Sequence, residues 1–257
     1  MLASANRPLV AVAVDWSGAR AASGQKKKIW WAQVSEQGAV ALRNGRTRAE
    51  VVEELLELSR DVDLIVGLDF AFSLPAWFMQ QQGWTRAAEL WSAEPESWLD
   101  GPRLPFWRSG KPDLPEHFRQ TEISAPRPGG RGPTSVFQCV GASQVGPGSL
   151  RGMGALARLQ LSGFAIWPFD APGAHTVLEI YPRVLAGGVK GDPAARRAAL
   201  EAAGAPEPWC AAGEESDDAF DAAISALALW RDRDAIQALP AATDPTECLE
   251  GRIWVPA

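Results

Sequence analysis

The chain has 257 residues, 46% of them hydrophobic and 22% charged, which excludes wholesale disorder and suits a single α/β domain. Its formal net charge of −6 excludes a generic nucleic-acid coat, because non-specific affinity for phosphates needs clustered Lys and Arg. Three scattered cysteines and two histidines exclude a disulfide scaffold and argue against a zinc site.

The apolar runs of the chain are short. The longest, Leu9–Val14, falls far below the ~20 residues that a membrane-spanning helix needs. The first residues also lack the layout of a signal peptide. We therefore expect a cytoplasmic protein that does not bind membranes, and the sequence does not predict its oligomeric state.

The first elements read as a three-stranded meander. Leu9–Val14 is apolar at every position, which is typical of a strand covered on both faces, and it ends at Asp15. A polar turn with Lys26–Lys28 at its tip leads into a second strand to Val34, and residues 39–43 form the third.

Helix and strand signals then alternate, which is typical of an α/β fold. The order is a helix that a capping box from Thr47 to Glu50 opens, a buried strand over 63–69, a strand over 176–182, a helix from Asp192-Pro193 to Gly204, a helix over 217–233 capped by Ser216, and a tail over 251–256 read as a closing strand or a packed tail.

The middle of the chain, residues 76–170, is rich in Gly, Pro and Trp and lacks apolar periodicity. We interpret it as an insertion within a single domain over 1–257. Its tryptophans are explained by short helices that bury them against the sheet, or by a lid whose exposed rings stack on unpaired bases; they are Trp77, Trp84, Trp91, Trp98 and Trp107.

The insertion is also basic. Residues 101–160 carry three acidic and eight basic side chains, the latter being Arg103, Arg108, Lys111, Arg119, Arg127, Arg131, Arg151 and Arg158. Nucleic acid is therefore a candidate partner through this segment alone. Solvated loop arginines explain the pattern about as well.

Acidic residues stand at the ends of the predicted strands. Asp15, Asp69 and Glu179 stand at or near strand ends, and ligands bind at the carboxyl edge of open α/β sheets. Asp218 and Asp221 share one face of the last major helix. Taken singly, each acid is explained as a cap or turn residue. Jointly they predict a Mg²⁺ or Mn²⁺ site, because converging carboxylates repel without a cation and hard oxygen ligands select these ions.

These residues also carry a resemblance, in five ordered motifs over residues 9–256: Val14-Asp15-Trp16-Ser17-Gly18, Gly67-Leu68-Asp69-Phe70-Ala71-Phe72-Ser73-Leu74-Pro75, Glu179-Ile180-Tyr181-Pro182-Arg183, Asp218-Ala219-Phe220-Asp221-Ala222 and Glu250-Gly251-Arg252-Ile253-Trp254-Val255-Pro256. The set resembles the family catalogued as domain of unknown function 429, described as predicted nucleases. Its Asp-x-x-Asp-Ala element is similar to the last-helix motif of RuvC-type junction resolvases.

The resemblance implies an RNase H-like fold, with a mixed five-stranded sheet and flanking helices. It implies metal binding and catalysis by Asp15, Asp69, Asp218 and Asp221, and Glu179 matches a motif peculiar to the resembled family. We further expect substrate contacts from Arg183, Ser17, Arg119 and Arg151. An ion pair with Glu179 is the equally good alternative for Arg183.

These observations predict a divalent-metal-dependent phosphodiester hydrolase, a nuclease for structured or single-stranded nucleic acid with a two-metal mechanism. The alternative from another class is a non-catalytic module that binds a nucleotide or a partner through Mg²⁺. A third reading, phosphotransfer to a small molecule, is disfavoured because no second nucleotide-binding domain is evident.

Overall fold

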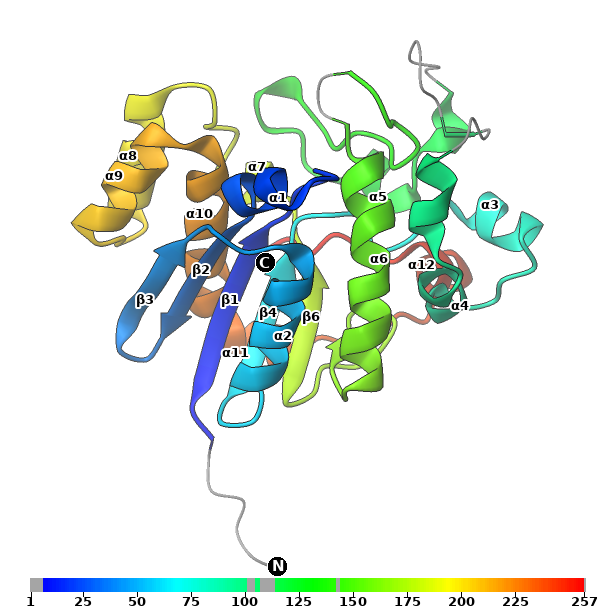
Figure 1. Cartoon of the computed structure of the whole chain (residues 1–257), viewed down its shortest axis with the longest axis horizontal. Helices are drawn as coiled ribbons and strands as arrows, with labels where there is room; N and C mark the ends of the chain where they lie inside the picture. The colour runs from blue at the N-terminus through cyan, green and yellow to red at the C-terminus, as the bar shows by residue number, and fades with distance from the viewer. Residues whose placement is uncertain (1–6, 101–104, 107–113, 142–143, 257) are drawn as a thin grey trace, which may run out of the picture.

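A mixed β-sheet organises the structure, a computed structural model that describes residues 7–100, 105–106, 114–141 and 144–256 (Figure 1). Within these residues the sheet has six strands in the order β3-β2-β1-β4-β6-β5. The strands are β1 Leu9–Asp15, β2 Trp30–Ser35, β3 Gly38–Arg43, β4 Asp63–Leu68, β5 Ala165–Ile166 and β6 His175–Glu179. The expected α/β class is confirmed. The expected five strands become six because the two residues of β5 pair in parallel with β6.

The sheet is antiparallel on one side and parallel on the other. β1, β2 and β3 form the expected meander, whereas β1, β4 and β6 run parallel. Val14 pairs with Leu68, and Leu68 pairs with Glu179. The carboxyl ends of these three strands therefore meet at one edge, which points upward in Figure 1.

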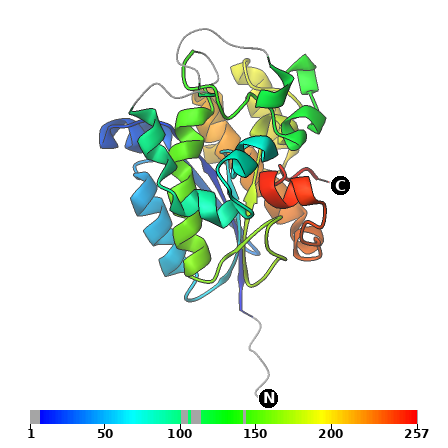
Figure 2. The ribbon, with the colours of Figure 1, turned by 90° about the vertical axis from the view of Figure 1, so that its right-hand side faces the viewer.

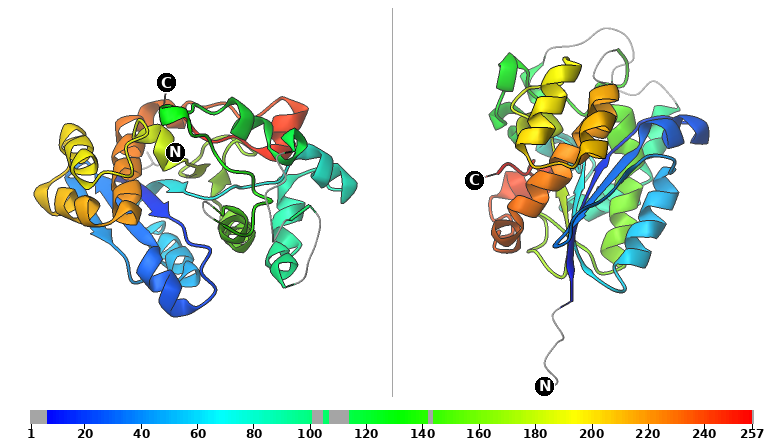
Figure 3. Two further views of the ribbon diagram at one scale, coloured as in Figure 1. Left: turned by 90° about the horizontal axis from the view of Figure 1, so that it is seen from above. Right: turned by 90° about the vertical axis from the view of Figure 1, so that its left-hand side faces the viewer.

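Helices cover both faces of the sheet (Figures 2 and 3). On one face lie α2 (Arg48–Leu58) and α6 (Gly146–Leu161), and on the other lies α10 (Asp217–Arg231). The remaining helices are α1 Ala22–Lys28, α3 Ala76–Gln81, α4 Ala87–Ser92, α5 Gln120–Ser124, α7 Pro182–Leu185, α8 Pro193–Ala202, α9 Glu207–Glu215, α11 Arg233–Gln237 and α12 Pro245–Glu250, with 3₁₀ segments at Pro95–Leu99, Pro115–His117 and Pro128–Gly130. Among the described residues, the helices are too short or too polar to cross a bilayer.

The alternation of side chains along β1 separates two cores. Val10, Val12 and Val14 pack with the α2 and α6 side, whereas Ala11 and Ala13 pack with α10. The small side chains let α10 approach the sheet closely. Gly67 of β4 serves the same purpose, since a Cβ there would lie 2.8 Å from Leu229 Cδ1 of α10.

The predicted helix starts are confirmed. Thr47 accepts a hydrogen bond from the Glu50 N–H, and the Glu50 side chain completes the capping box. Asp192 caps α8 by accepting from the Ala194 N–H, and Ser216 caps α10 by accepting from the Ala219 N–H. The cap sets the residue at which α10 begins, and therefore the direction in which each acid of the helix faces.

The polar turn expected before the second strand is wrong, because Ala22–Lys28 forms helix α1. Tertiary contacts of Gln25 hold it: the side-chain amide donates to Arg20 O at 3.1 Å and accepts from the Arg48 N–H at 3.1 Å. Lys26–Lys28 occupy the last turn of α1, where positive charge suits the helix dipole.

The segment over 76–170 contributes to the same layers as the rest of the chain. α6 packs on the sheet, and β5 joins its edge. Trp91 and Trp98 are buried, which confirms the packing interpretation for them, whereas Trp77 is 37% exposed. Trp107, like Arg103, Arg108 and Lys111, lies outside the described residues.

The chain returns to the sheet edge near its end. Ile253 forms an isolated parallel bridge with Glu179, and the Trp254 N–H donates to Glu179 O at 2.8 Å. The tail is thus packed beside β6 through a single bridge, which places Glu250 and Ile253 next to the carboxyl end of that strand.

Candidate metal centre

Two acids stand side by side at the carboxyl edge of the sheet. Asp15 is the last residue of β1, and Asp69 directly follows β4. The Asp69 N–H donates to Val14 O at 3.1 Å, which extends the parallel pairing by one step. By alternation, Asp15 follows Ala11 and Ala13, and Asp69 follows Ile65 and Gly67, so both side chains lie on the face that α10 covers.

α10 supplies the third acid. Asp221 is one turn inside the helix and only 1% exposed. It offers a carboxylate oxygen that lies within 4.8 Å of one from Asp15 and one from Asp69, and the same limit holds between those two. We call these three residues the carboxylate triad.

Asp218, the fourth predicted ligand, is not a member of the triad. It lies three residues before Asp221 and is half-buried. Its charge still reaches the triad, because it contributes to the raised pKa of Asp15. Its position is that of an outer acid beside the triad.

Burial is the main cause that raises the pKa of each triad carboxyl group, and repulsion by neighbouring acids adds to it. Burial, with Asp221 next, raises the pKa of Asp69 to about 7. Burial raises the pKa of Asp221 to about 6, although Lys190 opposes the shift. For Asp15, burial followed by Asp221 and Asp69 raises the pKa well above its usual value. A cation bound at the triad would favour the ionised form of all three groups.

Lys190 is a member of this site that the sequence did not indicate. It lies between α7 and α8, and its Nζ forms an ion pair with Asp221 Oδ2. Burial lowers the pKa of Lys190, but Asp221, Asp15 and Asp69 outweigh that effect, so the pKa is raised and the ammonium stays charged. The other carboxylate oxygen of Asp221, Oδ1, is buried and has no hydrogen-bond partner.

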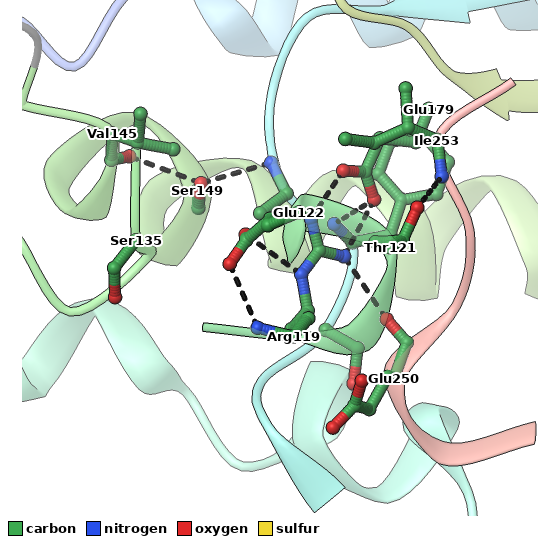
Figure 4. Close-up of polar contacts among 12 residues, drawn as sticks. Arg119, Thr121, Glu122, Ser135, Val145, Ser149, Glu179, Glu250 and Ile253 are labelled. Atoms are coloured by element: carbon green, nitrogen blue, oxygen red, sulfur yellow. Dashed lines mark hydrogen bonds and ion pairs between the residues drawn. The ribbon is translucent and has the colours of Figure 1, made fainter. Parts of the chain in front are cut away.

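Glu179 is engaged elsewhere (Figure 4). Its Oε2 accepts from Arg119 Nη1 at 2.8 Å and from the Phe72 N–H at 2.9 Å, and its Oε1 accepts from Arg119 Nη2 at 2.5 Å. Each oxygen is thereby already engaged by at least one donor, and the guanidinium of Arg119 binds both. Glu179 stands near the triad and adds to the raised pKa of Asp69, but it offers no free oxygen to an ion.

Arg119, expected to contact substrate, is 1% exposed and makes three hydrogen bonds besides those to Glu179. Its Nε donates to Glu122 at 2.9 Å and its Nη1 to Glu250 O at 3.0 Å, while its own N–H donates to Glu122 at 2.9 Å. This network joins α5, β6 and the end of α12 (Figure 4). Its contacts make it a brace for the sheet edge.

The other expected substrate residues differ in their accessibility. Arg151 donates to Gly18 O and pairs with Glu96, and Ser17 is buried with its Oγ accepting from the Ala19 N–H at 3.2 Å. Arg183 is half-buried and lines the cleft beside the triad. No ion pair joins Arg183 to Glu179, whose oxygens Arg119 occupies.

A cleft of about 980 Å³ opens onto the triad. Asp69, Asp221 and Lys190 form part of its wall, and further lining residues are the apolar Trp16, Phe118, Ile123, Tyr181 and Ile253 and the basic Arg127, Arg131 and Arg183. Of the described arginines in the basic insertion, Arg127, Arg131 and the buried Arg119 line the cleft, whereas Arg158 pairs with Glu53.

The donor set of the triad fits a hard divalent ion. All three donors are carboxylate oxygens, and Asp221 has a buried oxygen, Oδ1, without a hydrogen-bond partner. Comparison with protein-family profiles, with characterised proteins and with solved structures gave no match.

Proposed function

We propose that the protein is a divalent-metal-dependent hydrolase of phosphodiester bonds, acting on nucleic acid that is single-stranded or structured. The observation that carries the proposal is the triad of Asp15, Asp69 and Asp221, whose oxygens lie within 4.8 Å of one another, together with the unpartnered Oδ1 of Asp221. Such a cluster opposes folding unless a cation or protons offset its charge, which favours a cation bound at this place.

The ligand chemistry favours Mg²⁺ or Mn²⁺. Hard oxygen donors without His or Cys select these ions over zinc or copper. Asp15, Asp69 and Asp221 would hold the ion, with Asp218 as an outer acid. A bound ion of this kind supplies Lewis acidity toward a phosphoryl oxygen and lowers the pKa of water.

The surroundings of the triad favour a phosphodiester as substrate. Arg127, Arg131 and Arg183 line the same cleft as the triad, and guanidinium groups suit phosphate oxygens. In the reaction, a water oxygen bonds to phosphorus, the bond from phosphorus to the leaving oxygen breaks, and the leaving oxygen takes up the proton that the water loses. The resemblance in five sequence motifs points in the same direction.

Cleavage of end-labelled oligonucleotides tests the proposal. We expect the wild type to cut single-stranded or branched DNA or RNA in Mn²⁺ or Mg²⁺ but not with a chelator. Asp69→Asn and Asp221→Asn should each lose at least ~100-fold in rate. Asp61→Asn is the matched control, because Asp61 is exposed just before β4, at the opposite edge of the sheet, and it should cut normally.

A non-catalytic module that binds a nucleotide or a partner through Mg²⁺ is the contrary outcome. It would bind labelled oligonucleotide or nucleotide in Mg²⁺, measured by fluorescence anisotropy, without product under any metal. Absence of cleavage across single-stranded, duplex and branched substrates in both metals, with such binding retained, would overturn the hydrolase.

A further inference from the structure

Lys190 places a positive charge beside the carboxylate triad. Among the described residues, it is the only basic side chain that forms an ion pair with a member of the triad, through Nζ and Asp221 Oδ2. Its side chain is 31% exposed and lines the same cleft as Asp69 and Asp221, so the ammonium is accessible from the space that a substrate would enter. The contact therefore belongs to the site rather than to the core below it.

The backbone around Lys190 is held in place. Arg196 of α8 is buried and donates from Nη1 to Lys190 O at 2.7 Å, while its Nε donates to Gly213 O of α9 at 2.8 Å. Just before, Gly188 has a φ of +90° and packs against Pro128, so that a Cβ there would lie 3.1 Å from it. The loop is thus tied to two neighbours, and the ammonium reaches the triad from an anchored position.

The two carboxylate oxygens of Asp221 have different surroundings. Oδ2 is taken by Lys190, whereas Oδ1 is buried and unpartnered. Because Oδ2 is engaged by the ammonium, Asp221 cannot offer both of its oxygens freely to two metal ions. Here one oxygen remains for an ion.

Charge balance also favours a single divalent ion at the triad. The triad carries three negative charges when ionised, and one divalent ion together with one ammonium neutralises them. Two divalent ions beside the ammonium would bring an excess of positive charge that the single charge of Asp218 beside the triad does not fully offset.

We propose that the triad binds a single divalent ion and that the ammonium of Lys190 takes the place of the second ion of a two-metal site. This inference rests on the proposed function and revises the two-metal mechanism expected from the sequence. In that place the ammonium can donate a hydrogen bond to a phosphoryl oxygen of a substrate in the cleft, which supplies positive charge without a second ion.

Titration calorimetry of chelator-treated protein with Mn²⁺ tests the stoichiometry. We expect one ion per chain in the wild type. Lys190→Met should bind two ions, or one with affinity higher on the order of tenfold or more, because a positive charge has left the site. Lys190→Arg keeps the charge and should still bind one.

Lys28→Met is the matched control. Lys28 is an exposed lysine at the end of α1 whose charge reaches Asp218, but it forms no ion pair with the triad. Its loss removes the same charge from the neighbourhood, so one ion with nearly unchanged affinity is expected. An equal effect of Lys28→Met and Lys190→Met would mean that general electrostatics acts, and would overturn the assignment to Lys190.

The outcomes separate this inference from the function on which it rests. Two ions in the wild type, with normal cleavage, would overturn the role of Lys190 and leave the hydrolase intact. No ion in either the wild type or Lys190→Met would overturn both. Since the wild type alone decides the first point, the test holds even if Lys190→Met folds poorly.

Discussion

A carboxylate oxygen of Asp69 and one of Asp221 lie within 4.8 Å of each other, although one residue follows β4 and the other lies on α10. The sheet and the helix that covers it thus bring two carboxyl groups of like charge together at one site. Proximity of this kind opposes folding unless a cation or protons offset it.

Metal should stabilise the protein, and the loss of one ligand should remove the gain. In millimolar Mn²⁺, at roughly 100 times the dissociation constant, the wild type should gain roughly 5–10 °C in thermal midpoint. Asp69→Asn should gain little of this, yet without metal it should be no less stable than the wild type, since a repelling charge has gone. Differential scanning calorimetry measures both, with Asp61→Asn as control. A metal-free Asp69→Asn that melts well below the wild type would contradict the repulsion.

Without metal, stability should fall as the pH rises from about 5 to 8. The pKa values of Asp69 and Asp221 are raised to about 7 and about 6 by burial and neighbouring charge, whereas in the unfolded chain both ionise near pH ~3.9. Over the interval the folded state therefore binds more protons than the unfolded state, and raising the pH favours unfolding. Urea unfolding at several pH values measures the slope.

A second buried carboxyl group also contributes to the dependence of stability on pH, and a variant of that group separates the two contributions. Burial raises the pKa of Glu122 to about 7, although Arg119 opposes the shift. Asp69→Asn should reduce the dependence on pH, and Glu122→Gln should reduce it independently, since the two sites share no hydrogen bond. A flat profile in the wild type would show that the triad is not protonated in this range.

The Arg119 network should be structural rather than catalytic. Arg119→Met leaves Glu179 and Glu122 buried without their cation, which should cost about 3–5 kcal/mol in the free energy of unfolding. Glu179→Gln should also destabilise the fold, but its Mn²⁺ stoichiometry should match the wild type, because Glu179 has no free oxygen. Calorimetric titration of Glu179→Gln with Mn²⁺ measures this stoichiometry. Loss of Mn²⁺ binding in a folded Glu179→Gln would restore Glu179 to the ligand set.

Local signals predicted the part of the site that strands and caps position. Buried strands that end in Asp15 and Asp69, and a Ser216 cap that sets the phase of Asp221, follow from periodicity and capping alone. That they come together also needs parallel pairing of β1 and β4, which the sequence allows without specifying.

Long-range pairing was beyond the reach of such signals. Arg119 and Glu179 are 60 residues apart, and nothing local marks an arginine that will be buried by an acid. Lys190 stands in a glycine-containing loop, where its reach to Asp221 depends on how α8 anchors the backbone. Helix α1 was missed because Gln25 stabilises it through contacts with residues elsewhere in the chain, not through helix propensity.

Arg183 and Arg131 should contribute to nucleic-acid affinity through phosphates. Both line the cleft, and neither forms an ion pair with an acid of the described residues. With Asp69→Asn as a background that binds without cutting, Arg183→Gln and Arg131→Gln should each weaken binding of a labelled single strand and lower the slope of log affinity against log salt by about 1. Arg60→Gln, at the exposed turn after α2, removes the same charge away from the cleft and should change neither quantity. Equal losses in all three variants would mean that the protein's overall charge, not the cleft, guides the strand.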